Sequence, residues 1–165
     1  MRETKREFDV DALYDALDAQ RQHRGLSWAQ VSVEMGGVAT STITGMRSKG
    51  SVEGDGVLRM LCWLQRTPES FVPDLAGAPI REWRLPDLQP GEKLRFDTPK
   101  MHAALDAERS RRGLTWDQVA AEIGGFSPAM LKRLAKEGRV GFPRVMRLVR
   151  WLERPAADFT RVTDW

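Results

Sequence analysis

Apolar residues recur at helical spacing in short stretches of this chain, separated by glycines and by residues that favour helix caps. Leu13 and Leu17 lie about one helical turn apart, Asp9 precedes them as a candidate N-cap, and Gly25 follows them. Glycine readily adopts the left-handed conformation that ends a helix. The pattern therefore predicts a first helix that begins after Asp9 and ends at Gly25.

Four further helical segments are expected in the same half of the chain. Ser27 is the expected cap of a second helix, a third begins near Thr40, and a fourth opens at Asp55. A short last turn ends at Phe71, whose ring is expected to close the core. The other apolar positions expected to face inward are Trp28, Val31, Met35, Ile43, Met46, Val57, Leu61 and Leu64.

The chain contains the same unit twice. When it is aligned with itself at an offset of 88 positions, residues 8–72 match residues 96–160 without a gap. This alignment holds 24 identities in 65 positions, including most of residues 24–28 against 112–116. Self-similarity at a fixed offset is the signature of repeated structural units.

The repeat predicts two domains, at 8–72 and 96–162, with a linker at 73–95. The expected fold class is all-α: two tandem five-helix domains, each with its own core, joined by a Pro/Gly-containing linker. Fully extended, about 23 linker residues could reach about 75 Å, so the linker is not expected to restrict the domains. Its breakers are Pro73, Gly77, Pro79, Pro86, Pro90 and Gly91.

Residues 24–43 and 112–131 each carry a capped helix, a Gly-Gly turn and the start of another helix. In this order they resemble the lambda-repressor-like (Cro/CI, XRE-type) helix-turn-helix family. The resemblance covers both units and omits the linker. Ala39 stands where the family usually has a capping serine, and Thr40 is expected to cap in its place.

The resemblance implies that the third helix of each unit enters the major groove of double-stranded DNA. In the first unit the expected contacts are Thr40, Ser41, Thr42, Thr44, Gly45, Arg47 and Lys49. In the second unit they are Ser127, Ala129, Met130, Lys132, Arg133, Lys136, Arg139 and Arg144. Arg133 is the best candidate for a bidentate contact to guanine, and Lys136 and Arg139 for contacts to phosphate.

The two expected recognition helices differ while their scaffold is kept. Residues 38–49 and 126–137 share no identity in 12 positions. Apolar type is nevertheless retained at the inward positions, for example at Ile43 and Leu131. Two helices that bind different targets would show this pattern. The alternative is that one copy lost its original role and drifted.

Charge is unevenly distributed along the chain, whose net charge is +3. Residues 1–80 carry 9 Lys/Arg against 11 Asp/Glu, whereas residues 81–165 carry 17 against 12. The second half is therefore expected to face a polyanion more strongly. A single cysteine, Cys62, excludes an internal disulfide, and no signal peptide or membrane span is apparent. We expect a cytoplasmic, nucleoid-associated protein.

No pattern in the sequence indicates catalysis. Two histidines and one cysteine give no metal-ligand spacing, and no glycine-rich loop follows a predicted strand. We therefore expect no enzyme activity, no catalytic residue, no metal, no cofactor and no small-molecule substrate.

The expected function is a bacterial or phage transcriptional regulator, more specifically a repressor, that binds a bipartite DNA site. Self-association into a homodimer through Trp63 or Trp151 is an open possibility. The main alternative is a protein-interaction module, such as an antitoxin, an adaptor or a phage inhibitor. A third possibility is an architectural nucleoid protein with little sequence preference.

Overall fold

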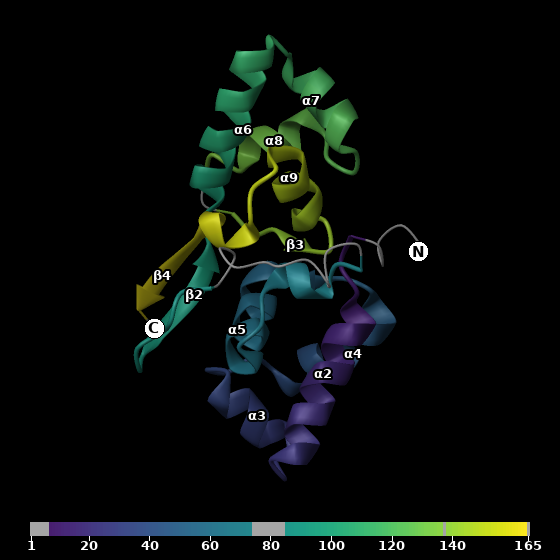
Figure 1. Cartoon of the computed structure of the whole chain (residues 1–165), viewed down its shortest axis with the longest axis vertical. Helices are drawn as coiled ribbons and strands as arrows, with labels where there is room; N and C mark the ends of the chain where they lie inside the picture. The colour runs from purple at the N-terminus through teal and green to yellow at the C-terminus, as the bar shows by residue number, and fades with distance from the viewer. Residues whose placement is uncertain (1–6, 74–84, 137, 165) are drawn as a thin grey trace.

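The computed structural model describes residues 7–73, 85–136 and 138–164. Helices make up most of the structure, and the two repeats lie at opposite ends of the long axis (Figure 1). The first repeat, unit one below, contains α2 (Val10–His23), α3 (Trp28–Glu34), α4 (Thr40–Lys49), α5 (Gly54–Leu64) and the 3-10 helix η1 (Pro68–Phe71).

The second repeat, unit two below, contains the same helices in the same order, about 88 residues further on. They are α6 (Thr98–Arg112), α7 (Trp116–Ile123), α8 (Pro128–Arg133), α9 (Val145–Leu152) and the 3-10 helix η2 (Ala156–Phe159). The helical segments expected in unit one are present, and α8 is shorter than its counterpart α4.

Local side-chain caps explain most of the helix starts. Asp9 accepts a hydrogen bond from the Ala12 N–H at 3.1 Å and so caps α2. Ser27 forms a reciprocal capping box with Gln30 at the start of α3. A side chain that accepts these otherwise unpaired N–H groups typically stabilises the helix by about 1 kcal/mol.

One expected cap and one expected helix start are wrong by one or two residues, whereas α4 itself begins at Thr40, as expected. Thr40 does not cap α4: the N-cap is Ala39, which has no side-chain acceptor, and Thr40 is the first helical residue. Likewise α5 is capped by Glu53, which accepts from the Gly56 N–H at 3.1 Å, so Asp55 lies inside the first turn.

The expectation of an all-α fold is wrong, because the described residues also form two antiparallel two-stranded sheets. In one, β1 (Val52–Glu53) pairs with β3 (Gly141–Phe142); in the other, β2 (Glu92–Phe96) pairs with β4 (Thr160–Asp164). The class is therefore mixed helix and strand. β2 takes up the last residues of the segment expected to be a linker, and it lies beside α5 of unit one.

The expectation of two separate cores is also wrong. One hydrophobic cluster of buried side chains runs through both units. At its centre the Phe142 ring of unit two lies 4.5 Å from the Phe8 ring of unit one and 5.6 Å from the Phe96 ring, centroid to centroid. Because burial of apolar surface is the main stabilising term in folding, the units depend on each other for stability.

The contacts between the units are reciprocal, as at a two-fold interface. Glu53 pairs with Gly141, its own counterpart 88 positions on. Val52 pairs with Phe142 on one side of this pair, and the Gly54 N–H donates to the Val140 carbonyl on the other. Phe8 packs on Phe142, and the counterpart of this contact is Phe96 against Gly54. An interface in which each patch meets its own counterpart is isologous. The chain thus folds as a dimer-like pair within one polypeptide.

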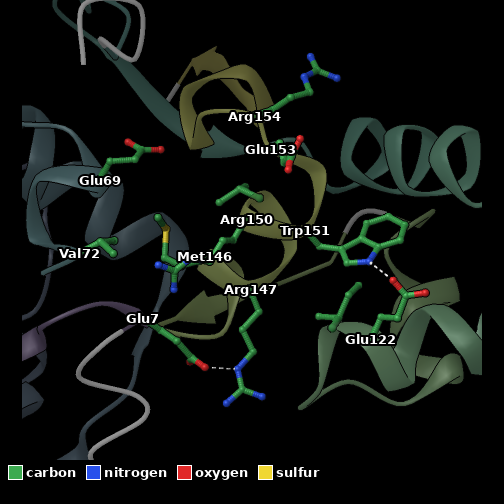
Figure 2. A pocket seen from close by; sticks show the side chains of 12 residues that line it. Glu7, Glu69, Val72, Glu122, Met146, Arg147, Arg150, Trp151, Glu153 and Arg154 are labelled. Atoms are coloured by element: carbon green, nitrogen blue, oxygen red, sulfur yellow. Dashed lines mark hydrogen bonds and ion pairs between the residues drawn. The ribbon is translucent and has the colours of Figure 1, made fainter. Parts of the chain in front are cut away.

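Polar contacts also join the units. Glu7 of unit one forms an ion pair with Arg147 of unit two (Figure 2). Arg95 lies 3.3 Å from the carboxylate of Asp55. The buried Glu69 carboxylate accepts from the Ala156 N–H at 2.6 Å, at the start of η2, and burial raises the pKa of Glu69. The units are therefore held in one arrangement, contrary to the freely separated domains expected from the linker length.

Candidate nucleic-acid interface

The expected recognition helices α4 and α8 keep one face in the core and leave the other outside. Ile43 and Met46 are the buried residues of α4, and Leu131 is the buried residue of α8. Every residue expected to contact DNA is exposed or half-buried, and the half-buried ones are Thr42, Gly45 and Met130.

The outer face of unit two is strongly basic. Ala129, Lys132, Arg133 and Lys136 follow helical spacing along one side of α8 and the turn after it. Its exposed cations make no ion pair with another described residue; they are Lys132, Arg133, Lys136, Arg139 and Arg144. Such a cluster has its full charge available for a polyanion.

Ser127 has a local structural role. Its hydroxyl oxygen accepts from the Met130 N–H at 3.2 Å and caps α8. Pro128 occupies the first helical position, where a missing N–H costs nothing. Ser127 therefore orients the helix that carries the cations.

The outer face of unit one is uncharged over most of its length. The Thr44 hydroxyl donates to the Thr40 carbonyl at 3.0 Å, and the Ser48 hydroxyl to the Gly45 carbonyl at 2.9 Å. Lys49 is exposed near the end of this helix. Unit one thus presents short hydroxyl side chains where unit two presents cations.

Arg47 is partly neutralised by unit one itself. Its guanidinium lies 3.8 Å from the carboxylates of both Asp11 and Asp15 and sits over the Tyr14 ring. The counterparts of these two acids in unit two are Pro99 and Ala103. The difference in charge between the two faces is therefore larger than the recognition helices alone suggest.

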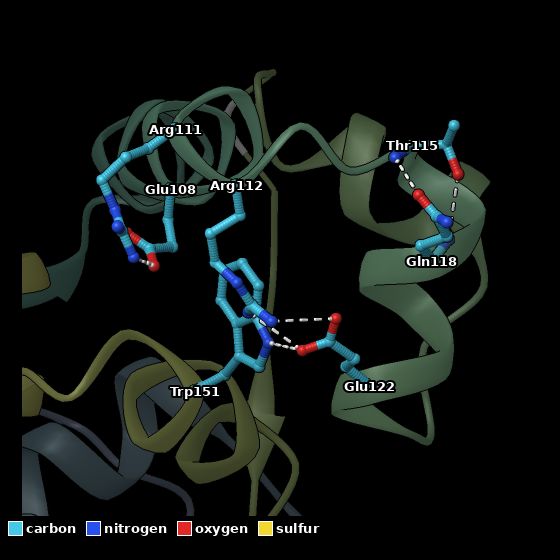
Figure 3. Close-up of polar contacts among 7 residues, drawn as sticks. All are labelled: Glu108, Arg111, Arg112, Thr115, Gln118, Glu122 and Trp151. Carbon is cyan, nitrogen blue, oxygen red and sulfur yellow. Dashed lines mark hydrogen bonds and ion pairs between the residues drawn. The ribbon is translucent and has the colours of Figure 1, made fainter.

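Residues that are identical in both units mostly build the scaffold. Arg112 of α6, Glu122 of α7 and Trp151 of α9 form a cluster in unit two (Figure 3), with Arg112 2.9 Å from Glu122. In unit one, Glu34 pairs with Arg24 and accepts from the Trp63 indole at 3.0 Å, and these contacts lower the pKa of Glu34. Sequence reasoning missed both clusters, although their repeated Arg, Glu and Trp positions were the available signal.

Cys62 is expected to react slowly with alkylating reagents. It lies half-buried on α5, and burial raises the pKa of its thiol to about 11. At pH 8 the thiolate fraction, and hence the alkylation rate by iodoacetamide, should be about 100-fold below that of an unperturbed thiol. Mass spectrometry of timed reactions measures this, with the denatured chain as the fast control. Equal rates in the folded and denatured chain would contradict the assignment.

The structure also bears on metal binding and on membrane insertion. Within the described residues, no group of three or more His, Cys, Asp or Glu side chains could hold a metal ion. Among the helices described, none combines the length and apolar character needed to cross a membrane.

Comparisons with models of protein families, with curated proteins and with solved structures found no match to this chain.

Proposed function

We propose that the chain binds double-stranded DNA with both units of one polypeptide and regulates transcription, as a repressor, in the cytoplasm and at the nucleoid. The observation that carries the proposal is the cluster of exposed cations on and after α8, each without an ion pair to a described residue. Phosphate contacts supply most non-specific affinity for DNA. The role is one of binding, without catalysis.

The dimer-like arrangement supports a particular form of DNA site. A two-fold pair of units matches two half-sites that run in opposite directions. Because the recognition helices share no identity, the two half-sites differ in sequence. The proposed site is thus inverted in geometry but not palindromic.

Chain geometry limits the spacing of the half-sites. Gly45 and Arg133 each lie eight positions before the central Glu53–Gly141 pair. Even with the connecting segments fully extended, these two residues lie no more than about 55 Å apart. Half-site centres two DNA turns apart would need about 68 Å, whereas one turn needs about 34 Å. One turn is therefore the spacing that both helices can use.

A protein-interaction module remains the second candidate, and one observation favours it. Asp11 and Asp15 surround the only arginine of the α4 face. Acidic side chains at that place repel phosphate and attract a basic protein surface. In this alternative unit one binds a basic protein surface, whereas unit two binds DNA or another partner, one that is acidic.

Selection of bound duplexes from a random pool tests the proposed function. We expect an enriched motif with two unlike, oppositely oriented halves, one more strongly selected than the other. Binding without a motif would favour an architectural protein. No duplex binding at low salt would overturn the proposal and favour the protein-interaction module.

Arg133→Ala is expected to weaken binding to the selected site about tenfold and to relax the preference at one base pair, since a bidentate contact to guanine is worth about 1–3 kcal/mol. Lys136→Ala should weaken all duplexes alike and lower the salt slope by about one. Fluorescence anisotropy at several salt concentrations measures both. Arg111→Ala, which removes an exposed cation at the far end of α6, is the charge-matched control and should change neither quantity.

A further inference from the structure

Each unit has a groove at the same place in its fold. The unit-one groove has a volume of about 970 Å³ and is lined by Met35, Leu61 and Trp63. The unit-two groove has a volume of about 620 Å³ and is lined by their counterparts Ile123, Val149 and Trp151. The repeat therefore supplies two versions of one groove, whose surroundings can be compared.

In unit one the chain itself lies along the groove. Residues 85–93, the last two of which begin β2, form its second wall. Leu85 is only 9% exposed, and Leu88, three positions on, packs against the core cluster. Residues 85–89 have neither helix nor strand structure, and Pro86 lies between the two leucines. The unit-one groove thus binds a segment without regular secondary structure, and two leucine side chains of that segment line the groove.

In unit two no such segment of the described chain lies along the groove. Its second wall consists of three side chains of unit one, Glu7, Glu69 and Val72 (Figure 2). Apolar side chains still line it, among them Met146. Seven of its lining residues are charged, including Glu122, Arg147 and Glu153. A concave pocket of this volume is typical of a binding site.

Glu69 offers a polar contact at this groove. Its first carboxylate oxygen accepts from the Ala156 N–H at 2.6 Å. The second oxygen is buried and has no hydrogen-bond partner among the described residues. A buried acceptor without a partner is costly, and Glu69 is one of the residues that line the groove.

We propose that the unit-two groove is a docking site for an extended peptide segment of a partner protein, with two leucine-like side chains three positions apart. The two leucines are inferred from the unit-one groove, where Leu85 and Leu88 of the chain itself occupy the equivalent position. The site is separate from the basic face of α8, and the inference does not depend on DNA binding.

The test uses the full-length, ¹⁵N-labelled chain and a synthetic peptide with the sequence of residues 85–91, Leu-Pro-Asp-Leu-Gln-Pro-Gly. The indole N–H signals of Trp151 and Trp63 are assigned by substituting each residue with Phe. We expect the Trp151 signal to shift saturably, with a dissociation constant of about 0.1–1 mM. The Trp63 signal should stay in place, because the chain's own segment already covers that groove.

A peptide in which both leucines are replaced by serine is the matched control, and it should bind about 100-fold more weakly. Ile123→Ser in the protein should weaken binding of the original peptide while leaving the other indole signals unchanged. Three results would overturn the proposal: no Trp151 shift at several mM peptide, equal shifts with the serine peptide, or a shift of Trp63 instead. A Trp151 signal that depends on protein concentration without peptide would assign the groove to a second copy of the chain and also overturn it.

Discussion

Five extra base pairs between the two half-sites are expected to weaken binding of the single chain about 100-fold. The insertion turns one half-site by about half a helical turn, to the opposite side of the DNA. The β1–β3 ladder and the shared phenylalanine cluster do not let one unit follow. Only one unit can then bind, and the gain from joining two binding sites is lost, which typically amounts to 10²–10⁴-fold. Anisotropy titrations with both duplexes measure the ratio.

Rearranged half-sites provide the controls for this experiment. A direct repeat of the same two half-sites should bind as weakly as the duplex with the insertion, since its second half-site faces the wrong way. A palindrome of either half-site should also bind more weakly than the unlike pair. Equal affinity for the original duplex and the duplex with the insertion would show that the units move independently. A perfect inverted repeat occupied by two chains, each using one unit, would refute binding by the pair.

Gly54→Ala is expected to destabilise the whole chain by about 3 kcal/mol. An added Cβ would lie 2.2 Å from the Val140 carbonyl oxygen and 2.8 Å from the Phe96 ring, so backbone or ring must move. The same Val140 carbonyl oxygen accepts a hydrogen bond from the Gly54 N–H at 2.8 Å. Overpacking of this kind costs about 1–3 kcal/mol or more, and here it also strains an inter-unit hydrogen bond. Urea unfolding monitored by circular dichroism measures the loss.

Gly45→Ala is the matched control for stability. Gly45 lies inside α4, and an added Cβ there meets no atom within 4 Å. Alanine is favoured over glycine in a helix by about 1 kcal/mol, so this variant should be slightly more stable than the parent. If both variants unfold at the same urea concentration, the close approach of the two units at Gly54 is incorrect.

The helices and most of their caps could be predicted because they depend on neighbouring residues. Asp9 and Ser27 lie at helix starts, and their side-chain oxygens accept hydrogen bonds from unpaired N–H groups in the first turn of each helix. The same local signals recur 88 residues later, which made the repeat visible. The cap of α4 was assigned to the wrong residue because Ala39 caps only through its backbone geometry and leaves no signal in its side chain.

The strands and the shared core could not be predicted in this way. β1 and β3 have two residues each, too few for an alternating pattern, and their partners lie 88 or more positions apart. One signal was present in the sequence: at matching positions one unit has Gly54 and the other Phe142, which differ greatly in size. In the structure each of these two residues meets a phenylalanine of the other unit.

The candidate site was predictable as a surface but not in its electrostatics. The exposed positions of α4 and α8 follow from helical spacing, and the structure leaves them outside the core. The pairing of Arg47 with Asp11 and Asp15 depends on how α2 packs against α4. A sequence that is considered one helix at a time does not contain that information.

The intrachain β1–β3 ladder has a consequence for dilution. A two-fold protein built from separate subunits falls apart when its concentration drops below its dimer dissociation constant, and its activity then depends on the square of subunit concentration. Here the partner unit is carried on the same polypeptide, so pairing of the two units needs no encounter between chains. Occupancy of any ligand that spans both units should follow the first power of chain concentration, down to a few molecules per cell.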